Sequence, residues 1–132
     1  MLWLLVLTSS LHYFAVIPII LAYQNKPLPF FNKIYLNTIL YATTISILWH
    51  FFNETSMLVY LDYGLAIVWF FQDILWSLLL SKPSIIYLNI VIFILHFLVR
   101  YTGDYLLYHS IWHGISAIKC IYISYIIKYY DI

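Results

Sequence analysis

The stretch Tyr108-His109-Ser110-Ile111-Trp112-His113 places two histidines four residues apart in a run that is otherwise apolar enough to lie in lipid. Residues at i and i+4 share one face of a helix, so both imidazoles can reach one point. Imidazole is polar and easily protonated, and burying two of them in hydrocarbon requires a metal, a carboxylate or a water-filled cavity. The stretch therefore predicts a helix whose histidines meet such a partner elsewhere in the chain.

The composition of the chain is typical of a polytopic membrane protein. Of its 132 residues, 65% are hydrophobic and 8% are charged, whereas a soluble domain carries about 25% charged residues. Trp and Tyr are abundant, as in the aromatic belts at membrane interfaces. The net charge of +1 gives no indication of nucleic-acid binding. Cys120 is the only cysteine, so the chain cannot form an internal disulfide.

Five apolar stretches are long enough to span a bilayer, which takes about 20 residues. They lie near residues 2–23, 34–52, 57–80, 84–100 and 105–127. Their connections are short, and the segment 24–33, with Pro27 and Pro29, is the one real loop. We therefore predict an all-α integral membrane bundle of about five transmembrane helices, forming a single domain over residues 1–132.

The basic residues of the connections predict the orientation of this bundle. Those at one end are Lys26, Lys33, Lys82 and Lys128. The other end carries Glu54, Arg100 and Asp104. Basic residues accumulate on the cytosolic side of membrane proteins. We therefore expect a lumenal or extracellular N-terminus and a cytosolic C-terminus, and the sequence does not indicate which organelle is involved.

Polar side chains from three predicted helices fall at one depth of this bundle. Ser46 and His50 lie near the lumenal end of the second helix, Asp62 lies in the first turns of the third, and His109 and His113 lie in the first turns of the fifth. Polar and ionisable groups within spans indicate functional sites. Because all five fall in the lumenal half, we predict that they meet.

Three neutral histidines with an open fourth position are typical of catalytic zinc sites. Zinc lowers the pKa of a bound water to about 7, a carboxylate such as Asp62 can act as general base, and a hydroxyl such as that of Ser46 can donate to a developing oxyanion. The sequence thus contains each part of a metal-assisted hydrolase. The alternative is that these residues only hydrogen-bond between helices.

Four other His, Asp or Lys residues lie inside the predicted spans. His96 lies at a depth similar to that of the other histidines and is either a further partner of the metal ligands or a packing residue, and packing is the favoured interpretation. His12 has no evident partner, and we interpret it as structural. Asp73 and Lys119 lie on the cytosolic halves of the third and fifth helices, and burying either alone is costly. We therefore predict that Asp73 and Lys119 pair.

The pattern Ser46-x-x-x-His50, then Asp62, then His109-x-x-x-His113 resembles the CREST superfamily. That superfamily includes the alkaline ceramidases, the progestin and adipoQ receptors, and the transmembrane-protein-8 and myomaker group. The flanking segments Gly103-Asp104-Tyr105 and Thr8-Ser9-Ser10-Leu11 resemble the myomaker group. The resemblance implies zinc bound by the three histidines, Asp62 as the base that holds the water, and Ser46 near the reacting carbonyl. The superfamily has seven helices, so five predict a shortened member with fewer walls around its lipid cavity.

The leading functional hypothesis is a zinc-dependent hydrolase that cleaves a lipid amide or ester within the bundle, as a ceramidase does. One alternative is a non-catalytic membrane protein that keeps the metal for stability and acts in lipid binding or membrane remodelling. Another is a degenerate relative that needs a partner chain or a homo-oligomer to complete the bundle. A catalytic site would leave one metal position open to a cavity, whereas a structural site would be closed by a fourth ligand such as His96 or Asp62.

Overall fold

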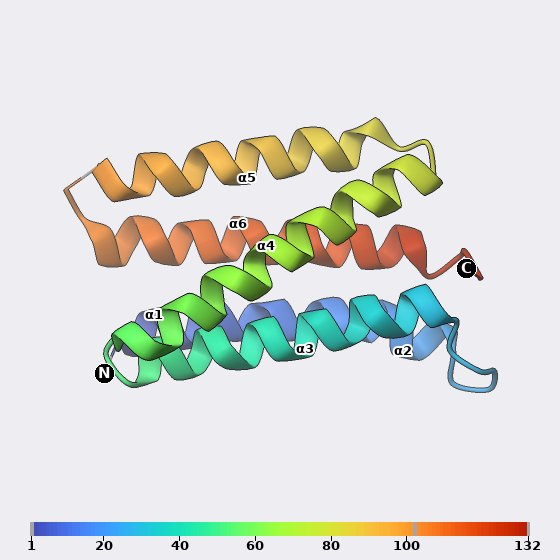
Figure 1. The fold of residues 1–132 in the computed structure, drawn as a ribbon, viewed down its shortest axis with the longest axis horizontal. Coiled ribbons are helices and arrows are strands. Elements are labelled where there is room, and N and C mark those ends of the chain that lie inside the picture. Colours follow the sequence, from blue (N-terminus) through green and yellow to red (C-terminus); the bar gives the residue numbers. More distant parts are fainter. Residues whose placement is uncertain (1, 102, 132) are drawn as a thin grey trace.

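The computed structural model describes residues 2–101 and 103–131, and this part of the chain contains helices and no strand (Figure 1). The helices are α1 (Trp3–Ser10), η1 (Leu11–Ala15), α2 (Val16–Ala22), α3 (Phe30–Phe51), α4 (Ser56–Leu79), α5 (Pro83–Tyr101) and α6 (Tyr105–Ile127). Since α1, η1 and α2 follow one another directly, they form one rod. The prediction of an all-α chain with five helices is therefore confirmed.

The first rod changes from α to 3-10 winding in its middle, over η1. Pro18 follows three residues after η1 ends, and a proline removes one backbone donor and clashes with the carbonyl four residues earlier, here that of Phe14. In 3-10 winding, side chains three residues apart are eclipsed. Ser9 and His12, which are three apart at the entry to this segment, are both buried.

The other helices begin at residues that suit a helix N-terminus. Pro29 precedes α3, so α3 begins at Phe30 rather than at the predicted Ile34. Pro83 opens α5, where its missing N–H would have no helical partner in any case. The carboxylate of Asp104 accepts a hydrogen bond from the Leu107 amide at 3.1 Å, which caps α6. The cap at Asp104 fixes the start of α6 and places His109 in the first turns of that helix.

The five rods form a ring in which each packs against two neighbours. The first rod packs against α3 and α6, α3 packs against α4, α4 against α5, and α5 against α6. Figure 1 shows α4 crossing the bundle obliquely, with the N-terminus and C-terminus at opposite ends. The buried hydrophobic cluster lies toward the C-terminal end and includes Ile19, Tyr35, Ile85 and Ile127. The buried side chains of His50 and His109 lie toward the opposite end of the bundle.

Within the described residues, three helices are long and apolar enough to cross a membrane. They are Trp3–Ala22, Ser56–Leu79 and Tyr105–Ile127, and α5 is apolar over the shorter range Pro83–Val99. Half of the most apolar window of α6 is buried in the bundle, against 11% of that of α4, so α6 is the more buried of the two helices. Large apolar side chains such as Leu78 are exposed, in an amount that a soluble monomer rarely tolerates.

Candidate metal centre

His50, His109 and His113 meet inside the bundle, as the sequence predicts. One ring nitrogen from each lies within 4.8 Å of the other two, and all three side chains are buried. His50 comes from the last turn of α3, and the other two come from the first half of α6. No other group of three or more His, Cys, Asp or Glu residues among the described residues has this geometry. The three histidines could hold a metal ion.

The spacing of the ring nitrogens suits a shared cation. The Nε2 atoms of His50 and His113 lie 3.1 Å apart, and two nitrogens bound tetrahedrally at 2.0–2.1 Å would lie about 3.3 Å apart. The ring centroid of His109 lies 5.3 Å from that of His50 and 4.7 Å from that of His113. The two Nε2 atoms, 3.1 Å apart, need a proton or a cation between them, because their lone pairs otherwise repel each other.

Glu54 orients the ring of His50, a role that the sequence analysis missed. Its Oε1 atom lies 3.0 Å from Nδ1 of His50 and accepts a hydrogen bond of 2.6 Å from the Tyr105 hydroxyl. A carboxylate only accepts, so Nδ1 carries the proton and Nε2 presents its lone pair to the other histidines. Carboxylates commonly orient metal-binding histidines in this way.

The turn between α3 and α4 brings Glu54 back to His50. The backbone angle φ is 56° at Asn53 and 60° at Glu54, a left-handed conformation that costs a side-chain-bearing residue about 1–2 kcal/mol. The Glu54 amide donates to the Trp49 carbonyl at 2.7 Å, which holds the turn against the end of α3. Such strain is often stored beside functional sites, and here it places a carboxylate at the metal centre.

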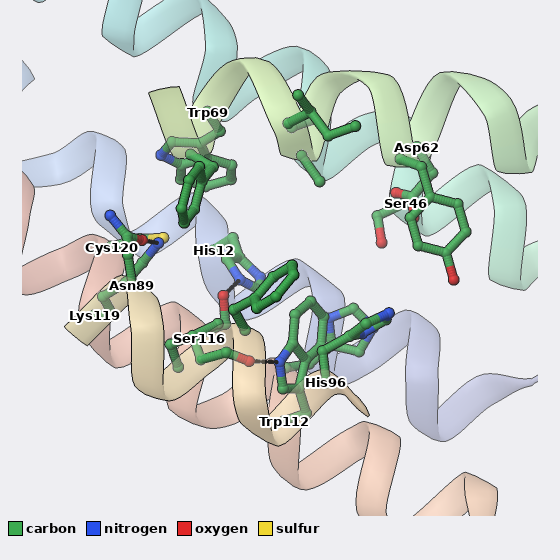
Figure 2. A pocket seen from close by; sticks show the side chains of 18 of the residues that line it. His12, Ser46, Asp62, Trp69, Asn89, His96, Trp112, Ser116, Lys119 and Cys120 are labelled. Atoms are coloured by element: carbon green, nitrogen blue, oxygen red, sulfur yellow. Dashed lines mark hydrogen bonds between the residues drawn. The ribbon is translucent and has the colours of Figure 1, made fainter. Parts of the chain in front are cut away.

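Ser9 links the histidines to the other predicted site residues. Its hydroxyl lies 3.2 Å from Nε2 of His113 and 3.4 Å from the hydroxyl of Ser46. The side chains of Ser46 and Asp62 lie side by side in Figure 2, and both line the same cavity. Asp62 does not belong to the group of candidate metal ligands. The five predicted residues therefore divide into a histidine group and a Ser46–Asp62 pair.

The remaining histidines lie beside this centre. His96 is not one of the candidate ligands, and its ring centroid lies 6.4 Å from that of His109 and 5.1 Å from that of Trp112. His12 has partners that the sequence did not reveal. Its Nδ1 donates to the Ser9 carbonyl at 3.0 Å, and its Nε2 accepts from the Ser116 hydroxyl at 3.1 Å. His12 thereby connects the first rod to α6.

A cavity of about 670 Å³ lies beside the centre, within the range of small-molecule sites. Figure 2 shows Ser46 and Asp62 on one side of this cavity and Asn89, Lys119 and Cys120 on the other. His109 and His113 also line it. The walls between are mostly apolar, and include Ala42, Ala66, Ile67, Trp69, Phe70, Phe71, Ile92, Phe93, Phe97 and Trp112. The cavity thus opens the metal centre to an apolar space.

The predicted pair of Asp73 and Lys119 is confirmed. The Lys119 ammonium donates to Oδ2 of Asp73 at 2.7 Å and to Oδ1 of Asn89 at 2.9 Å. The hydroxyl of Tyr35 donates to Oδ1 of Asp73 at 2.7 Å, and both charged side chains are buried. This group ties α4 to α6, α5 and α3. It lies at the end of the cavity formed by Asn89, Lys119 and Cys120, which we call the inner end.

Comparisons of this chain with protein-family models, with curated proteins and with solved structures found no match. The resemblance to the CREST superfamily therefore stays a prediction that rests on the spacing of a few residues.

Proposed function

We propose that the chain is a membrane-embedded zinc hydrolase that acts on a lipid amide or ester. The observation that carries this proposal is the convergence of three buried histidines beside a cavity of lipid-compatible character. Among the described residues no fourth His, Cys, Asp or Glu completes the group. Three protein ligands and one free position are the pattern of catalytic rather than structural zinc sites.

The donor set fits zinc better than a hard cation. All three candidate donors are imidazole nitrogens, which suit zinc, copper, iron and nickel, whereas calcium and magnesium prefer oxygen. The 3.1 Å separation of Nε2 of His50 and Nε2 of His113 is compatible with zinc and with the other ions of that set, and zinc is the ion of this set that commonly serves hydrolysis. Glu54 supports binding further, because its contact with Nδ1 raises the basicity of the His50 ring.

The chain's own residues supply the acid–base steps of hydrolysis. A bound zinc ion would polarise the substrate carbonyl and make water acidic. Asp62 accepts a proton from the attacking water while the water oxygen bonds to the carbonyl carbon. The same carboxyl group then gives that proton to the leaving nitrogen or oxygen as its bond to carbon breaks. Ser46 lies beside Asp62 (Figure 2), and the products are a fatty acid and an amine or alcohol.

We propose that all five rods cross the membrane, with the N-terminus in the lumen or outside the cell and the C-terminus in the cytosol. The placement of the termini at opposite ends of the bundle supports an odd number of crossings (Figure 1). Lys26, Lys33, Lys82 and Lys128 support the orientation. The metal centre would then lie in the lumenal half. The spacing of the three histidines, Ser46 and Asp62 supports membership of the CREST superfamily as a shortened member.

The test is a hydrolysis assay of the purified, zinc-loaded protein with ceramides and phospholipids in mixed micelles. We expect product from the wild type, and at least a hundredfold less from His113→Ala and Asp62→Asn, since general base catalysis alone contributes about 10²–10⁴-fold. The matched control is Ser110→Ala, because Ser110 lies on α6 beside His109 but its hydroxyl bonds the Leu106 carbonyl. Zinc binding without turnover of any of these lipids would favour the non-catalytic alternative.

A further inference from the structure

The inner end of the cavity carries a polar group whose hydrogen-bonding capacity is incomplete. Asn89 and Lys119 both line the cavity and lie on the side away from Ser46 and Asp62 (Figure 2). Asn89 is 2% exposed, and its Nδ2 atom has no hydrogen-bond partner among the described residues. Buried amide groups are nearly always hydrogen-bonded in proteins, so this donor requires an explanation.

The amide of Asn89 cannot be turned to satisfy itself. The Lys119 ammonium carries only donors and lies 2.9 Å from Oδ1 of Asn89. Reversing the amide would put N–H groups against the ammonium and lose that bond. The amide oxygen therefore faces Lys119, and the NH₂ group is left without a partner beside the cavity. An acceptor from outside the chain is needed to complete it.

The surrounding charges favour a neutral acceptor. The ammonium of Lys119 is already balanced by Asp73 at 2.7 Å, and this ion pair is buried. A carboxylate placed at Asn89 would add an uncompensated negative charge near Asp73, which is costly in an apolar interior. A ketone or hydroxyl oxygen accepts the amide N–H without that cost. The walls that lead to this position are apolar, so the rest of the ligand is an acyl chain.

The distance along α6 sets where on the chain this oxygen would lie. His113 and Lys119 are six residues apart, which corresponds to about 9 Å along the helix axis. An extended hydrocarbon advances roughly 1.3 Å per bond, so about seven bonds span this distance. With a carbonyl at the metal centre, and with the amide of Asn89 taken at the depth of Lys119, to which it is hydrogen-bonded, the seventh to ninth carbon of the chain lies near Asn89.

We infer that the cavity selects acyl chains that carry a neutral oxygen, as a ketone or hydroxyl, near the eighth carbon, with Nδ2 of Asn89 donating to that oxygen. This inference deepens the proposed function by naming a substrate class. It rests on the metal centre as the anchor for the head of the lipid, and it does not rest on turnover.

The test uses hydroxamic acids. Their head groups chelate metals, so binding can be measured without turnover. Octadecane hydroxamic acids with a ketone at carbon 8 or at carbon 14 are compared by displacement of a fluorescent acyl probe from the zinc-loaded protein. The two isomers share one head, one length and one ketone, so their desolvation costs match. We expect the carbon-8 isomer to bind about fivefold more tightly, as one net hydrogen bond provides.

Two variants locate the effect. Asn89→Leu keeps the size of the side chain, adds no charge and removes the donor, and is expected to abolish the preference for carbon 8. Thr43→Val is the matched control, because Thr43 also lines the cavity and its hydroxyl also has no partner among the described residues. The preference is expected to survive in Thr43→Val. Loss of the preference in Thr43→Val alone would overturn the assignment to Asn89.

Equal affinity of the two isomers for the wild type would overturn the inference, because water would then satisfy Asn89. The outcomes separate this inference from the proposed function. Lipid turnover with equal affinities would leave the hydrolase standing and remove the oxygen site. A preference for carbon 8 without turnover of any lipid would leave the oxygen site standing and remove the hydrolase.

Discussion

The metal centre and the Lys119–Asp73 pair lie within two turns of each other on α6, and they solve the problem of buried polarity differently. The pair brings opposite charges together at 2.7 Å, so the chain neutralises itself there. The histidine group brings together three bases, which could share a metal ion from outside. The comparison teaches that a buried ion pair can clamp helices together by itself, whereas a buried group of like bases leaves room for a cation.

The largest expected effect comes from breaking the clamp. Lys119→Met leaves Asp73 buried without its cation, and we expect the free energy of unfolding to fall by about 3–5 kcal/mol. The double variant Lys119→Met with Asp73→Asn removes both charges and is expected to recover more than half of that loss. Unfolding in a detergent titration measures both. Equal losses in the single and double variants would contradict an ion pair that neutralises itself.

A smaller effect is expected where the clamp meets α3. Tyr35 is fully buried and donates to Asp73 at 2.7 Å. Tyr35→Phe removes this donor to a charged acceptor, and we expect a loss of about 1.5–3 kcal/mol in the same titration. The control is Tyr41→Phe, which lies on α3 and is 65% exposed. A loss no larger than the control's would show that Tyr35 does not support the pair.

The histidine side of the comparison is sharpened by Glu54. Glu54→Gln keeps the shape of the side chain and weakens its hold on Nδ1 of His50, so we expect metal affinity to fall about 10–100-fold. Tyr105→Phe removes the donor to Glu54 and is expected to cost less. Competition with a zinc chelator measures both affinities. Unchanged affinity in Glu54→Gln would mean that this contact does not tune the site.

The smallest effect is expected at the exposed pair of Lys26 and Asp131, which lie 3.1 Å apart. Hydrogen bonds from Tyr23 and Lys26 lower the pKa of Asp131. A lowered native pKa means that this contribution is present above the unfolded pKa of about 4 and is lost as the pH falls through the native value. Because the pair is exposed to solvent, Lys26→Met is expected to shift Tm by less than about 1 °C at neutral pH.

The exposed pair of Lys26 and Asp131 serves as the control for the buried pair of Lys119 and Asp73. If Lys26→Met lowered Tm as much as Lys119→Met, burial would not explain the strength of the Lys119–Asp73 clamp. Thermal unfolding of both variants at pH 7 and at pH 3 makes the comparison directly. The small effect of Lys26→Met is expected to shrink as the pH falls toward the lowered pKa of Asp131.

Long apolar runs made the five helices predictable, and helical spacing made the site partly predictable. The interval of four residues between His109 and His113 and the matching depth of His50 led to the histidine group. Matching depth also led to the pair of Asp73 and Lys119. These inferences succeeded because straight antiparallel helices convert residue number into depth.

The missed residues depend on local departures from straight helices. Glu54 reaches His50 only because two residues adopt positive φ after α3 ends. Ser9 and His12 face His113 and Ser116 only because the first rod changes winding before Pro18. The incomplete hydrogen bonding of Asn89 depends on the rotamer of Lys119. The spacing of His50 and Glu54 was a usable signal, whereas the others require three-dimensional packing.

The most direct test of the central claim is the zinc content of the purified protein, measured by mass spectrometry of the metal together with X-ray absorption. We predict about one zinc ion per chain in the wild type and in Ser110→Ala, bound to nitrogens at about 2.0–2.1 Å. His113→Ala is predicted to lose at least nine-tenths of it. Wild-type protein that binds no zinc, or His113→Ala protein that keeps it, would contradict the account.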